Sequence, residues 1–377
     1  MDNAAKTYLH AKPALLKTLY FTVTNDLSYD QRMIRICGTL SEAGYQVVLI
    51  GRKMKNSLPL TKRGFAQKRL NCFFNKGKAF YLEYNIRLLF WLLFKKMDLV
   101  CAIDLDTIMP SYVVSRLKKI PRVYDAHELF CEMKEVVTRP GVYRIWKSVE
   151  RFAIPRFPAG YTVSSQISAF LNQEYGVSYP VIRNISRFIK PQLQTKKEKL
   201  ILYQGAVNEG RYFEHLIPAM QWVNAPLHIY GDGNFMDQLE TLISKHGLQH
   251  KVILKGKLQP EELQRITGSA YIGITLFENT GLSNYFSLSN RFFDYIQAGL
   301  PQLCSDYPAY REIIDLYDIA VPITDHSPVN IARELNNLLD NEVLYNRLQD
   351  NCLAAAKNLN WENEENELLS FYQKIVN

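Results

Sequence analysis

The feature of this chain best suited to chemistry is a helix that begins at small hydroxyl side chains and carries a carboxylate about one turn later. It lies in residues 283–301, SNYFSLSNRFFDYIQAGLP, where Ser289 or Asn290 can act as the N-cap and a Gly-Leu-Pro stop ends the helix. The unpaired N–H groups and the positive dipole end of such a helix bind phosphate, and Asp294 is placed to accept from ribose hydroxyls. The segment predicts an anion site, with an ordinary capped core helix as the alternative.

Ionisable residues also follow two strand-like segments of the first half. The segment YDAHE contains Asp125, His127 and Glu128 at the end of an expected strand, where α/β folds build their sites. We favour a site role for this group. Asp104 and Asp106 end the preceding strand in the same way and would hydrogen-bond the hydroxyls of an acceptor. Capping of the next helix explains these two aspartates equally well.

Two strand ends in the second half contain glycine and are candidates for contact with a ligand. In YQGAVNEGRYFEHL, a strand passes through Gly205 into a loop, and Arg211 precedes an amphipathic helix. The forked guanidinium group of an arginine suits a diphosphate. In IYGDGN, Gly231 permits a positive φ or the close approach of a ligand, although the turn alone can explain it.

Short apolar strands alternate with amphipathic helices through both halves, which predicts parallel α/β sheets. Two doubly wound units would hold ligands at the carboxyl ends of their strands and in the cleft between them. The expected strands are 18–24, 46–51, 99–104, 122–126, 161–164, 200–205, 227–231, 252–256, 271–276 and 302–305, and the expected helices include 30–43, 213–222 and the one near 290.

Length and composition indicate a soluble protein of two domains. The chain has 377 residues, of which 47% are hydrophobic and 22% are charged. Its first 21 residues lack the pattern of a secretory signal, and its longest strongly apolar run, 88–94, is far shorter than the roughly 20 residues that span a bilayer. The six cysteines include no CxxC pair, so neither a zinc site nor a disulfide framework is expected. These features predict a cytoplasmic protein.

The charge is distributed unevenly along the chain. Residues 1–190 hold 30 Lys and Arg against 14 Asp and Glu, whereas residues 200–377 hold 12 against 22. Nine basic residues and no acidic one lie in 52–78, followed by the aromatic segment FYLEYNIRLLFWLLFKK. This combination suits peripheral contact with an anionic membrane, and a core helix beside a solvated basic face explains it equally well. No nucleic-acid-binding motif accompanies the basic residues, so nucleic acid is not an expected partner.

Taken together, these segments resemble the retaining glycosyltransferases of family 4, which have the GT-B fold. The resemblance implies an α/β fold with two doubly wound Rossmann-like domains that face each other across a cleft. It runs over nearly the whole chain and rests on LSYDQRMIRICGTLSEAGYQVVLIGR (27–52), DLDT (104–107), VYDAHE (123–128), TVSS (162–165), VIRNI (181–185), LYQGAVNEGR (202–211), IYGDG (229–233), VILKGKL (252–258) and NRFFDYIQAGLP (290–301). The implied parts are an acceptor-binding domain at 1–190, a linker at 191–199, a nucleotide-sugar-binding domain at 200–358 and a C-terminal helix at 359–377 that crosses back to the first domain.

The resemblance also implies roles for single residues. Arg211 and the helix N–H groups would neutralise the donor diphosphate, so neither a metal nor another cofactor is expected. Asp294 would bind the ribose, and Lys257 and Leu258 would lie near the base. The implied catalytic residues are His127, Arg211, Asp125 and Glu128; the donor-binding residues are Gly205, Arg211, Gly231, Lys257, Leu258, Ser287, Ser289, Asn290 and Asp294; and the acceptor-binding residues are Asp26, Asp30, Asp104 and Asp106.

The chain departs from the family pattern at two places. The family's E-x7-E motif requires a carboxylate eight residues before Asp294, where this chain has Phe286. Asn284, Tyr285 and Ser287 are the candidate substitutes. The glycine-rich loop that usually follows the first strand is also missing, because residues 24–30 contain no glycine.

The expected function is transfer of a sugar from a nucleotide-sugar to a glycan or polyprenyl-linked acceptor, in the synthesis of a bacterial surface polysaccharide or glycoprotein glycan. The resemblance implies retention of the anomeric configuration, and the basic first half of the chain predicts a peripheral position at the inner face of the membrane. Two alternatives stay open. One is a nucleotide-sugar 2-epimerase with the same fold, and the other is a non-catalytic scaffold that binds a nucleotide-sugar.

Overall fold

The computed structural model describes residues 17–28, 30–188 and 198–376. The chain divides into two compact units. The first contains the residues up to Asp125, Arg151–Gly160 and the end of the chain from Leu368, and the second contains Ala126–Glu150 and Tyr161–Glu367. The predicted linker at 191–199 lies outside the described residues except for its last two positions, and the domain limits expected from the sequence stay predictions.

The elements of the first half alternate between strands and helices. They are β1 (Thr18–Thr22), α1 (Gln31–Glu42), β2 (Gln46–Lys53), β3 (Ala66–Asn71), α2 (Gly77–Leu93), β4 (Leu99–Ile103), η1 (Leu105–Thr107), α3 (Ile108–Lys118), β5 (Arg122–Ala126), η2 (Phe130–Glu132), α4 (Lys134–Val137), α5 (Pro140–Ala153), η3 (Ile154–Arg156), β6 (Ala159–Thr162) and α6 (Ser165–Tyr175).

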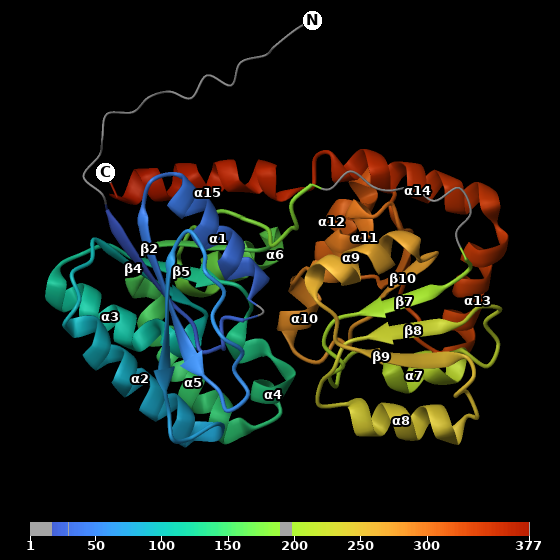
Figure 1. Ribbon diagram of the computed structural model, residues 1–377, viewed down its shortest axis with the longest axis horizontal. Coiled ribbons are helices and arrows are strands. Elements are labelled where there is room, and N and C mark those ends of the chain that lie inside the picture. Colours follow the sequence, from blue (N-terminus) through green and yellow to red (C-terminus); the bar gives the residue numbers. More distant parts are fainter. Residues whose placement is uncertain (1–16, 29, 189–197, 377) are drawn as a thin grey trace, which may run out of the picture. The chain divides into compact units, whose positions relative to one another are not determined.

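The second half repeats this alternation and ends in three consecutive helices (Figure 1). Its elements are β7 (Ile201–Gln204), α7 (Phe213–Ala219), β8 (Leu227–Tyr230), α8 (Met236–Lys245), β9 (Val252–Gly256), α9 (Pro260–Ser269), β10 (Ile272–Thr275), α10 (Leu282–Phe286), α11 (Asn290–Gln297), β11 (Gln302–Ser305), α12 (Pro308–Tyr317), β12 (Ala320–Ile323), α13 (Pro328–Asp340), α14 (Glu342–Ala356) and α15 (Trp361–Val376).

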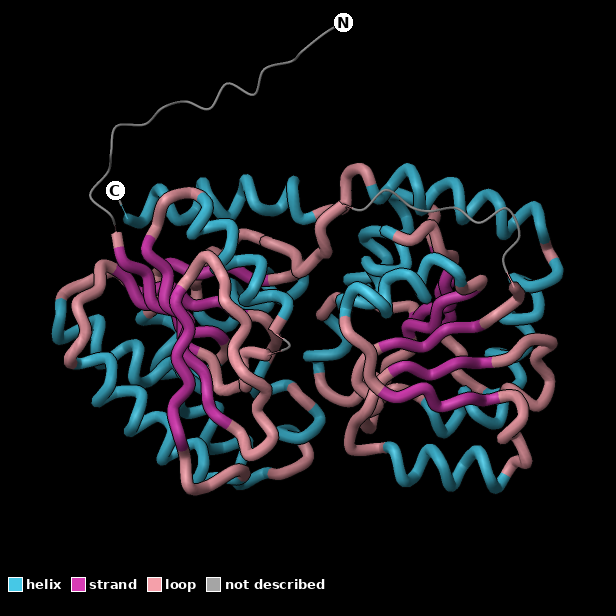
Figure 2. The backbone as a smooth tube through the Cα atoms, viewed as in Figure 1, coloured by secondary structure: helices cyan, strands magenta, loops and turns pink. Residues whose placement is uncertain are grey.

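The strands form two six-stranded sheets, drawn in magenta in Figure 2. Their orders are β3-β2-β1-β4-β5-β6 and β12-β11-β10-β7-β8-β9. The pairings from β3 to β5 in the first sheet and all those of the second sheet are parallel, for example Leu19 with Val47 and Ile201 with Leu227. Each order runs outward in both directions from a central strand, which confirms the predicted α/β class with two doubly wound Rossmann-like units.

The sequence reading missed the two edge strands β3 and β12. The residues of β3, AQKRLN, are mostly polar and exposed, so they lack the apolar run that identifies a buried parallel strand. In β12, AVPI, the strand contains Pro322, a residue that argues against a central strand and is tolerated at an edge. The other strand positions were predicted to within a few residues.

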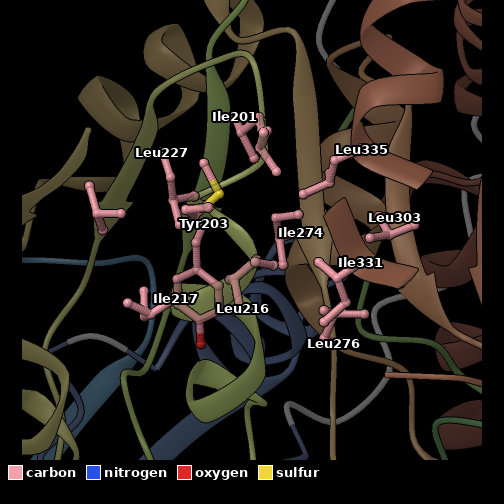
Figure 3. Close-up of a cluster of buried hydrophobic side chains, with 14 of the residues drawn as sticks. Ile201, Tyr203, Leu216, Ile217, Leu227, Ile274, Leu276, Leu303, Ile331 and Leu335 are labelled. Carbon is pink, nitrogen blue, oxygen red and sulfur yellow. The ribbon is translucent and has the colours of Figure 1, made fainter. Parts of the chain in front are cut away.

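The second sheet has a hydrophobic core on each face. Ile201 and Tyr203 of β7 belong to a cluster with residues of α7 and α13 (Figure 3), which also includes residues of α8. Leu202 between them packs with Tyr295 and Leu300 on the opposite side. Alternation of side chains along a strand explains this division. In Figure 1, α7 and α8 lie along one side of the sheet and α9 and α11 along the other.

The core of the first unit includes one face of α2. Phe80, Tyr84, Leu88 and Leu92 recur every fourth residue and pack with side chains from β1, β2 and β4. From Leu368 on, α15 belongs to this unit, where the Tyr372 ring lies 5.8 Å from the ring of Phe21.

Two glycines let the backbones of β7 and β8 come together at their carboxyl ends. Gly231 has a φ of 156° and Gly205 has a φ of 116°. A Cβ atom added at Gly231 would lie 1.8 Å from the carbonyl oxygen of Gly205. Both predicted glycine positions therefore serve the close approach of two loops, and no side chain fits at Gly231 without a backbone shift.

We expect Gly231→Ala to lower the free energy of unfolding by about 1–3 kcal/mol, because the added methyl group displaces the backbone of Gly205. Urea unfolding followed by circular dichroism measures the change. Gly268→Ala in α9 is the matched control, since nothing lies within 4 Å of its added Cβ. Equal unfolding midpoints for Gly231→Ala and the wild type would contradict the predicted clash.

Candidate functional site

Two arginine side chains of the second unit lie beside the same aromatic ring. The guanidinium carbon of Arg211 lies 4.3 Å from the centroid of the Phe277 ring. That of Arg291 lies 5.1 Å from this centroid and 4.2 Å from that of Tyr203. A Cβ atom added at Gly205 would lie 3.6 Å from Arg291 Nη2, so the missing side chain leaves room beside the guanidinium group. The loops after the neighbouring strands β7 and β10 and the first turn of α11 thus meet here.

Neither guanidinium group is neutralised by a carboxylate. Within the described residues no ion pair involves Arg211 or Arg291, and Arg211 Nε and Arg291 Nη1 are buried without a hydrogen-bond partner. Arg211 Nη1 donates to Asn284 Oδ1 over a long distance of 3.4 Å. Burial and the nearby positive charge of Arg291 lower the pKa of Arg211. Because buried unpaired charges are costly, two such cations favour a bound polyanion.

Arg291 lies in the first turn of α11, next to the backbone amides at the start of this helix. Ser289 is the N-cap, but its Oγ makes no capping bond and has no partner among the described residues. Its amide donates to the Tyr310 hydroxyl at 3.3 Å, so one predicted phosphate donor is engaged within the protein. The Asn290 amide donates to no described residue, while the Asn290 side chain accepts from Asn184 Nδ2 at 2.6 Å. Asn290 is therefore the better candidate for an amide contact with phosphate.

The carboxylate of Asp294 is held by a polar network. Its Oδ1 accepts from Ser186 Oγ at 2.6 Å, and its Oδ2 accepts from Gln204 Nε2 at 3.2 Å. Gln204 Oε1 accepts in turn from Thr267 Oγ1 at 2.6 Å. The network connects α11 to the end of β7 and α9, and it orients a side chain that is partly exposed.

A carboxylate that the sequence reading did not single out lies close to the loop of Arg211. Glu278 Oε2 accepts from Lys134 Nζ at 2.8 Å, and the Glu278 amide donates to the Gly210 carbonyl at 3.0 Å. A Cβ atom added at Gly210 would lie 3.8 Å from Asn284 Nδ2 and 3.9 Å from Glu278 Oε2. Glu278 and Asn284 therefore border the same loop, and Asn284 is one of the predicted substitutes for the missing glutamate.

The remaining predicted donor-side residues are spread over separate loops. Lys257 pairs with Asp232 at 3.1 Å, and both side chains are largely exposed. Leu258 is partly buried after β9, and Ser287 follows α10, where its amide donates to the Ser283 carbonyl at 3.1 Å. In residues 17–28, 30–188 and 198–376, no group of three or more His, Cys, Asp or Glu side chains could hold a metal ion.

Asp125 is buried at the end of β5 and binds Arg32. Its Oδ1 accepts from Arg32 Nη2 at 2.6 Å, and its Oδ2 accepts from Nε at 3.2 Å. This bidentate pair within the first unit ties β5 to α1, and the geometry favours a positioning role for Asp125 over the predicted catalytic one. His127 and Glu128 follow β5 in the second unit and are partly exposed.

Asp26 and Asp30, both predicted to bind an acceptor, make contacts within the region after β1. Asp26 forms an ion pair with Arg69 at 2.6 Å. Burial alone would raise the pKa of Asp26, but hydrogen bonds from Ser28 and Ser57 and the charge of Arg69 lower it. Asp30 is the N-cap of α1, where its carboxylate accepts from a backbone amide of the first turn at 2.9 Å. Both carboxylates therefore take part in the local fold.

Asp106 is a buried carboxyl group whose pKa is raised. It follows β4, is 8% exposed and accepts a hydrogen bond from the hydroxyl of Thr24. Burial, and then the negative charge of Asp104, raise the pKa of Asp106 to about 7. A carboxyl group that is half protonated near neutral pH can both donate to and accept from a hydroxyl. Of the four predicted acceptor residues, Asp106 fits that contact best.

Sequence reasoning missed Arg291 and Glu278. Arg291 lies in the first turn of α11, where a cation opposes the helix dipole. That unfavourable position is the signal that could have identified it. Glu278 lies 16 residues before Asp294, outside the spacing of the expected motif, so only the structure brings it to the site.

We expect Asp106→Asn to change how stability depends on pH. The unfolded carboxyl group ionises near pH 4 and the folded one near pH 7, so the folded wild type binds an additional proton between these values. Its stability therefore falls as the pH rises through this window, by up to about 1.4 kcal/mol per pH unit. The neutral amide of the variant removes this contribution.

Urea unfolding at pH 5 and pH 8 measures the slope. Asp315→Asn, at a side chain that is 65% exposed, is the control and should behave as the wild type. If Asp106→Asn keeps the wild-type slope, the Asp106 carboxyl group is not the source of the pH dependence of stability.

Comparison with protein families matches the two halves of the chain in succession. The family described as Glycosyltransferase Family 4 matches residues 31–193, and the family described as Glycosyl transferases group 1 matches residues 185–357. A curated relative, an uncharacterized glycosyltransferase of Methanocaldococcus jannaschii, is 25% identical over 183 residues, which are 47% of this chain and 45% of that protein. The match therefore spans less than half the length of that relative.

Solved structures match the chain over nearly its whole length. Sucrose-phosphate synthase from Thermosynechococcus elongatus has a TM-score of 0.78 at 14% identity and covers 95% of this chain and 98% of its own. A glycosyltransferase from Rickettsia africae has a TM-score of 0.73 at 13% identity, with coverages of 96% and 98%. HepE of Anabaena, in complex with UDP, has a TM-score of 0.71 at 12% identity, with coverages of 95% and 100%. These likenesses establish the GT-B fold. The two family matches, which together run from residue 31 to residue 357, identify the chain as a member of the family 4 glycosyltransferases, a family of transferase enzymes.

Proposed function

We propose that the chain transfers a sugar from a nucleotide-sugar to a glycan or polyprenyl-linked acceptor, with retention of the anomeric configuration, in the synthesis of a bacterial surface glycan. The observation that carries this proposal is the pair of unneutralised guanidinium groups beside Phe277, that of Arg291, which is buried, and that of Arg211, which is partly buried. A diphosphate brings enough negative charge to compensate both cations, whereas a single carboxylate compensates only one.

Two matched structures support the choice of substrates. HepE of Anabaena has also been solved in complex with UDP-glucose, which is a nucleotide-sugar. WaaG, which matches with a TM-score of 0.68 at 16% identity, is a glycosyltransferase involved in lipopolysaccharide biosynthesis. The shared fold makes the same type of donor and the same kind of product reasonable proposals for this chain.

In the proposed complex, the diphosphate accepts hydrogen bonds from Arg211, Arg291 and the Asn290 amide. Asp294 binds the ribose, and the loop of Lys257 and Leu258 lies near the base. As the glycosidic bond to the donor breaks, negative charge grows on the leaving diphosphate, and fixed positive groups stabilise that charge. The two guanidinium groups supply this stabilisation, so the proposed reaction requires no metal.

We assign the contacts with the donor sugar and the acceptor to carboxylates and a histidine near the strand ends. Glu278, oriented by Lys134, is proposed to bind hydroxyl groups of the donor sugar in place of the missing glutamate of the family motif. His127 and Glu128 are proposed to line the reaction centre. Asp106 is proposed to bind an acceptor hydroxyl because its carboxyl group is partly protonated near neutral pH.

One assay tests the proposal against its alternatives. The protein is incubated with UDP-, GDP-, ADP- and TDP-sugars, with and without polyprenyl-linked acceptors, and the products are analysed by mass spectrometry. A glycosylated acceptor supports transfer. An isomerised sugar without acceptor would show an epimerase, and unchanged ligands that raise the melting temperature would show a binding scaffold.

We expect Arg211→Met and Arg291→Met each to weaken binding of the matching nucleoside diphosphate about tenfold or more, because each removes a charged donor to the diphosphate. The unliganded Arg211→Met protein should unfold at the same or a higher temperature than the wild type, because burial and the positive charge of Arg291 disfavour the Arg211 cation. Calorimetry and thermal unfolding measure the two effects.

Arg333→Met, at a side chain that is 71% exposed in the same unit, is the control. Unchanged affinity in both site variants would show that the diphosphate does not bind at Arg211 and Arg291. A loss of stability together with affinity would instead indicate a structural role for the arginines.

We expect Glu278→Gln to lower the turnover number while leaving the affinity for the nucleoside diphosphate unchanged, because the proposed contact is to the sugar and not to the diphosphate. Steady-state kinetics and calorimetry with the nucleoside diphosphate separate the two quantities. Glu214→Gln, at an exposed position in the first turn of α7, is the control. A turnover number equal to that of the wild type would contradict the assignment.

A further inference from the structure

The outer face of α2 is as apolar as its inner face. The inner face packs into the core of the first unit. The outer face carries large apolar side chains at every fourth position: Leu82 (66% exposed), Ile86 (45%), Phe90 (58%) and, directly after the helix, Phe94 (84%). Helices at a protein–water boundary normally carry polar residues on the outer side, so this ridge indicates contact with something other than water.

The segment before α2 extends this apolar surface. Phe73 is 82% exposed and Phe74 is 54% exposed. Both backbone amides donate to the carboxylate of Glu83 at 2.9 Å, and the Arg87 guanidinium carbon lies 5.1 Å from the centroid of the Phe73 ring. Side chains of α2 thus hold the two phenylalanines in place. We call the six apolar residues the α2 patch: Phe73, Phe74, Leu82, Ile86, Phe90 and Phe94.

Positive charge surrounds the α2 patch. Lys76 and Lys78 lie at the start of the helix, and Lys95 and Lys96 lie at its end. Residues 52–96 contain 12 basic side chains and one acidic side chain, that of Glu83. This carboxylate also pairs with Arg87 at 2.7 Å, so it is engaged within the α2 region. The surface is therefore apolar in the middle and cationic at both ends.

The neighbouring helix continues the same surface. α3 lies beside α2 (Figure 1), and its last turn carries Arg116 and Lys118. Leu117 between them is 65% exposed. Lys118 Nζ donates to the carbonyl of Leu93 at 2.8 Å, which connects the ends of the two helices.

We infer that the α2 patch docks on an anionic lipid surface, with the helix parallel to the membrane, its apolar ridge at the boundary of the acyl chains and its lysines at the headgroup phosphates. The charge selects this occupant, because a second copy would bring two cationic faces together, whereas anionic headgroups neutralise them. No helix within the described ranges is both long and apolar enough to cross a bilayer. The inference stands on the α2 patch alone and does not depend on the proposed transfer reaction.

Vesicle flotation with the full chain tests this inference. The protein is mixed with vesicles of phosphatidylcholine alone or with one third phosphatidylglycerol, at low and high salt. We expect binding to the anionic vesicles only, and weaker binding at high salt because the electrostatic attraction is screened. Failure of the wild type to float with anionic vesicles would overturn the inference.

Two charge variants with equal loss of charge locate the contact. One changes Lys76, Lys78, Lys95 and Lys96 to Gln, and the other changes Lys53, Lys62, Arg63 and Lys68 to Gln. The first should reduce partitioning about tenfold or more, since each basic residue at a lipid surface contributes about 1 kcal/mol, and the second should reduce it less. Equal reductions would show that net charge, and not the α2 patch, controls binding.

The apolar part is tested by the double variant Phe90→Ser, Phe94→Ser. It should lose binding to anionic vesicles, whereas the double variant Leu316→Ser, Val343→Ser, at exposed positions of the second unit, should bind as the wild type. Sedimentation velocity without lipid tests the alternative occupant of the α2 patch, which is a second copy of the chain. A wild-type dimer that dissociates in the Phe90, Phe94 variant, with no binding to vesicles, would assign the α2 patch to a second copy of the chain.

Discussion

Two positive charges that lie close together, one buried and one partly buried, favour a bound anion, and the loops of the second unit bring these charges together. The rings of Phe277 and Tyr203 lie against Arg211 and Arg291, and this contact stabilises cations without neutralising them. The guanidinium groups are therefore in position before any ligand arrives. Groups that are already oriented reorganise little when charge develops during a reaction, which is the usual origin of electrostatic catalysis.

The other buried cations of the chain show why this pair is unusual. Arg32 is bound by both oxygens of Asp125, and Lys147 lies 2.6 Å from a carboxylate oxygen of Glu150. Each of these cations has its counterion from the protein, as a structural role requires. Arg211 has no such partner in the described part of the chain. This contrast within one molecule supports the proposal that Arg211 and Arg291 bind a ligand, whereas Arg32 and Lys147 stabilise the fold.

Much of the fold and part of the site could be predicted from the sequence. The strands β5 and β9 were assigned to the residue because each contains a short apolar run, VY in β5 and VIL in β9, between polar or loop-forming residues. Asp125, by contrast, looks like an exposed acid at a strand end, and only the position of Arg32, 93 residues earlier in the chain, makes it a buried ion-pair partner. Long-range pairing of this kind leaves no local pattern. Glu278 could not be predicted for the same reason, because its partner Lys134 is 144 residues away in the chain.

The edges of the two sheets also have a consequence for how the protein behaves at high concentration. An exposed edge strand can recruit a strand from another molecule and start aggregation. At one edge, β3 is a short polar strand that presents the exposed side chain of Lys68. At another, β12 contains Pro322, which has no N–H group to donate to an incoming strand. At these two edges, charge and a missing hydrogen-bond donor oppose edge-to-edge association of copies that are crowded together in the cell.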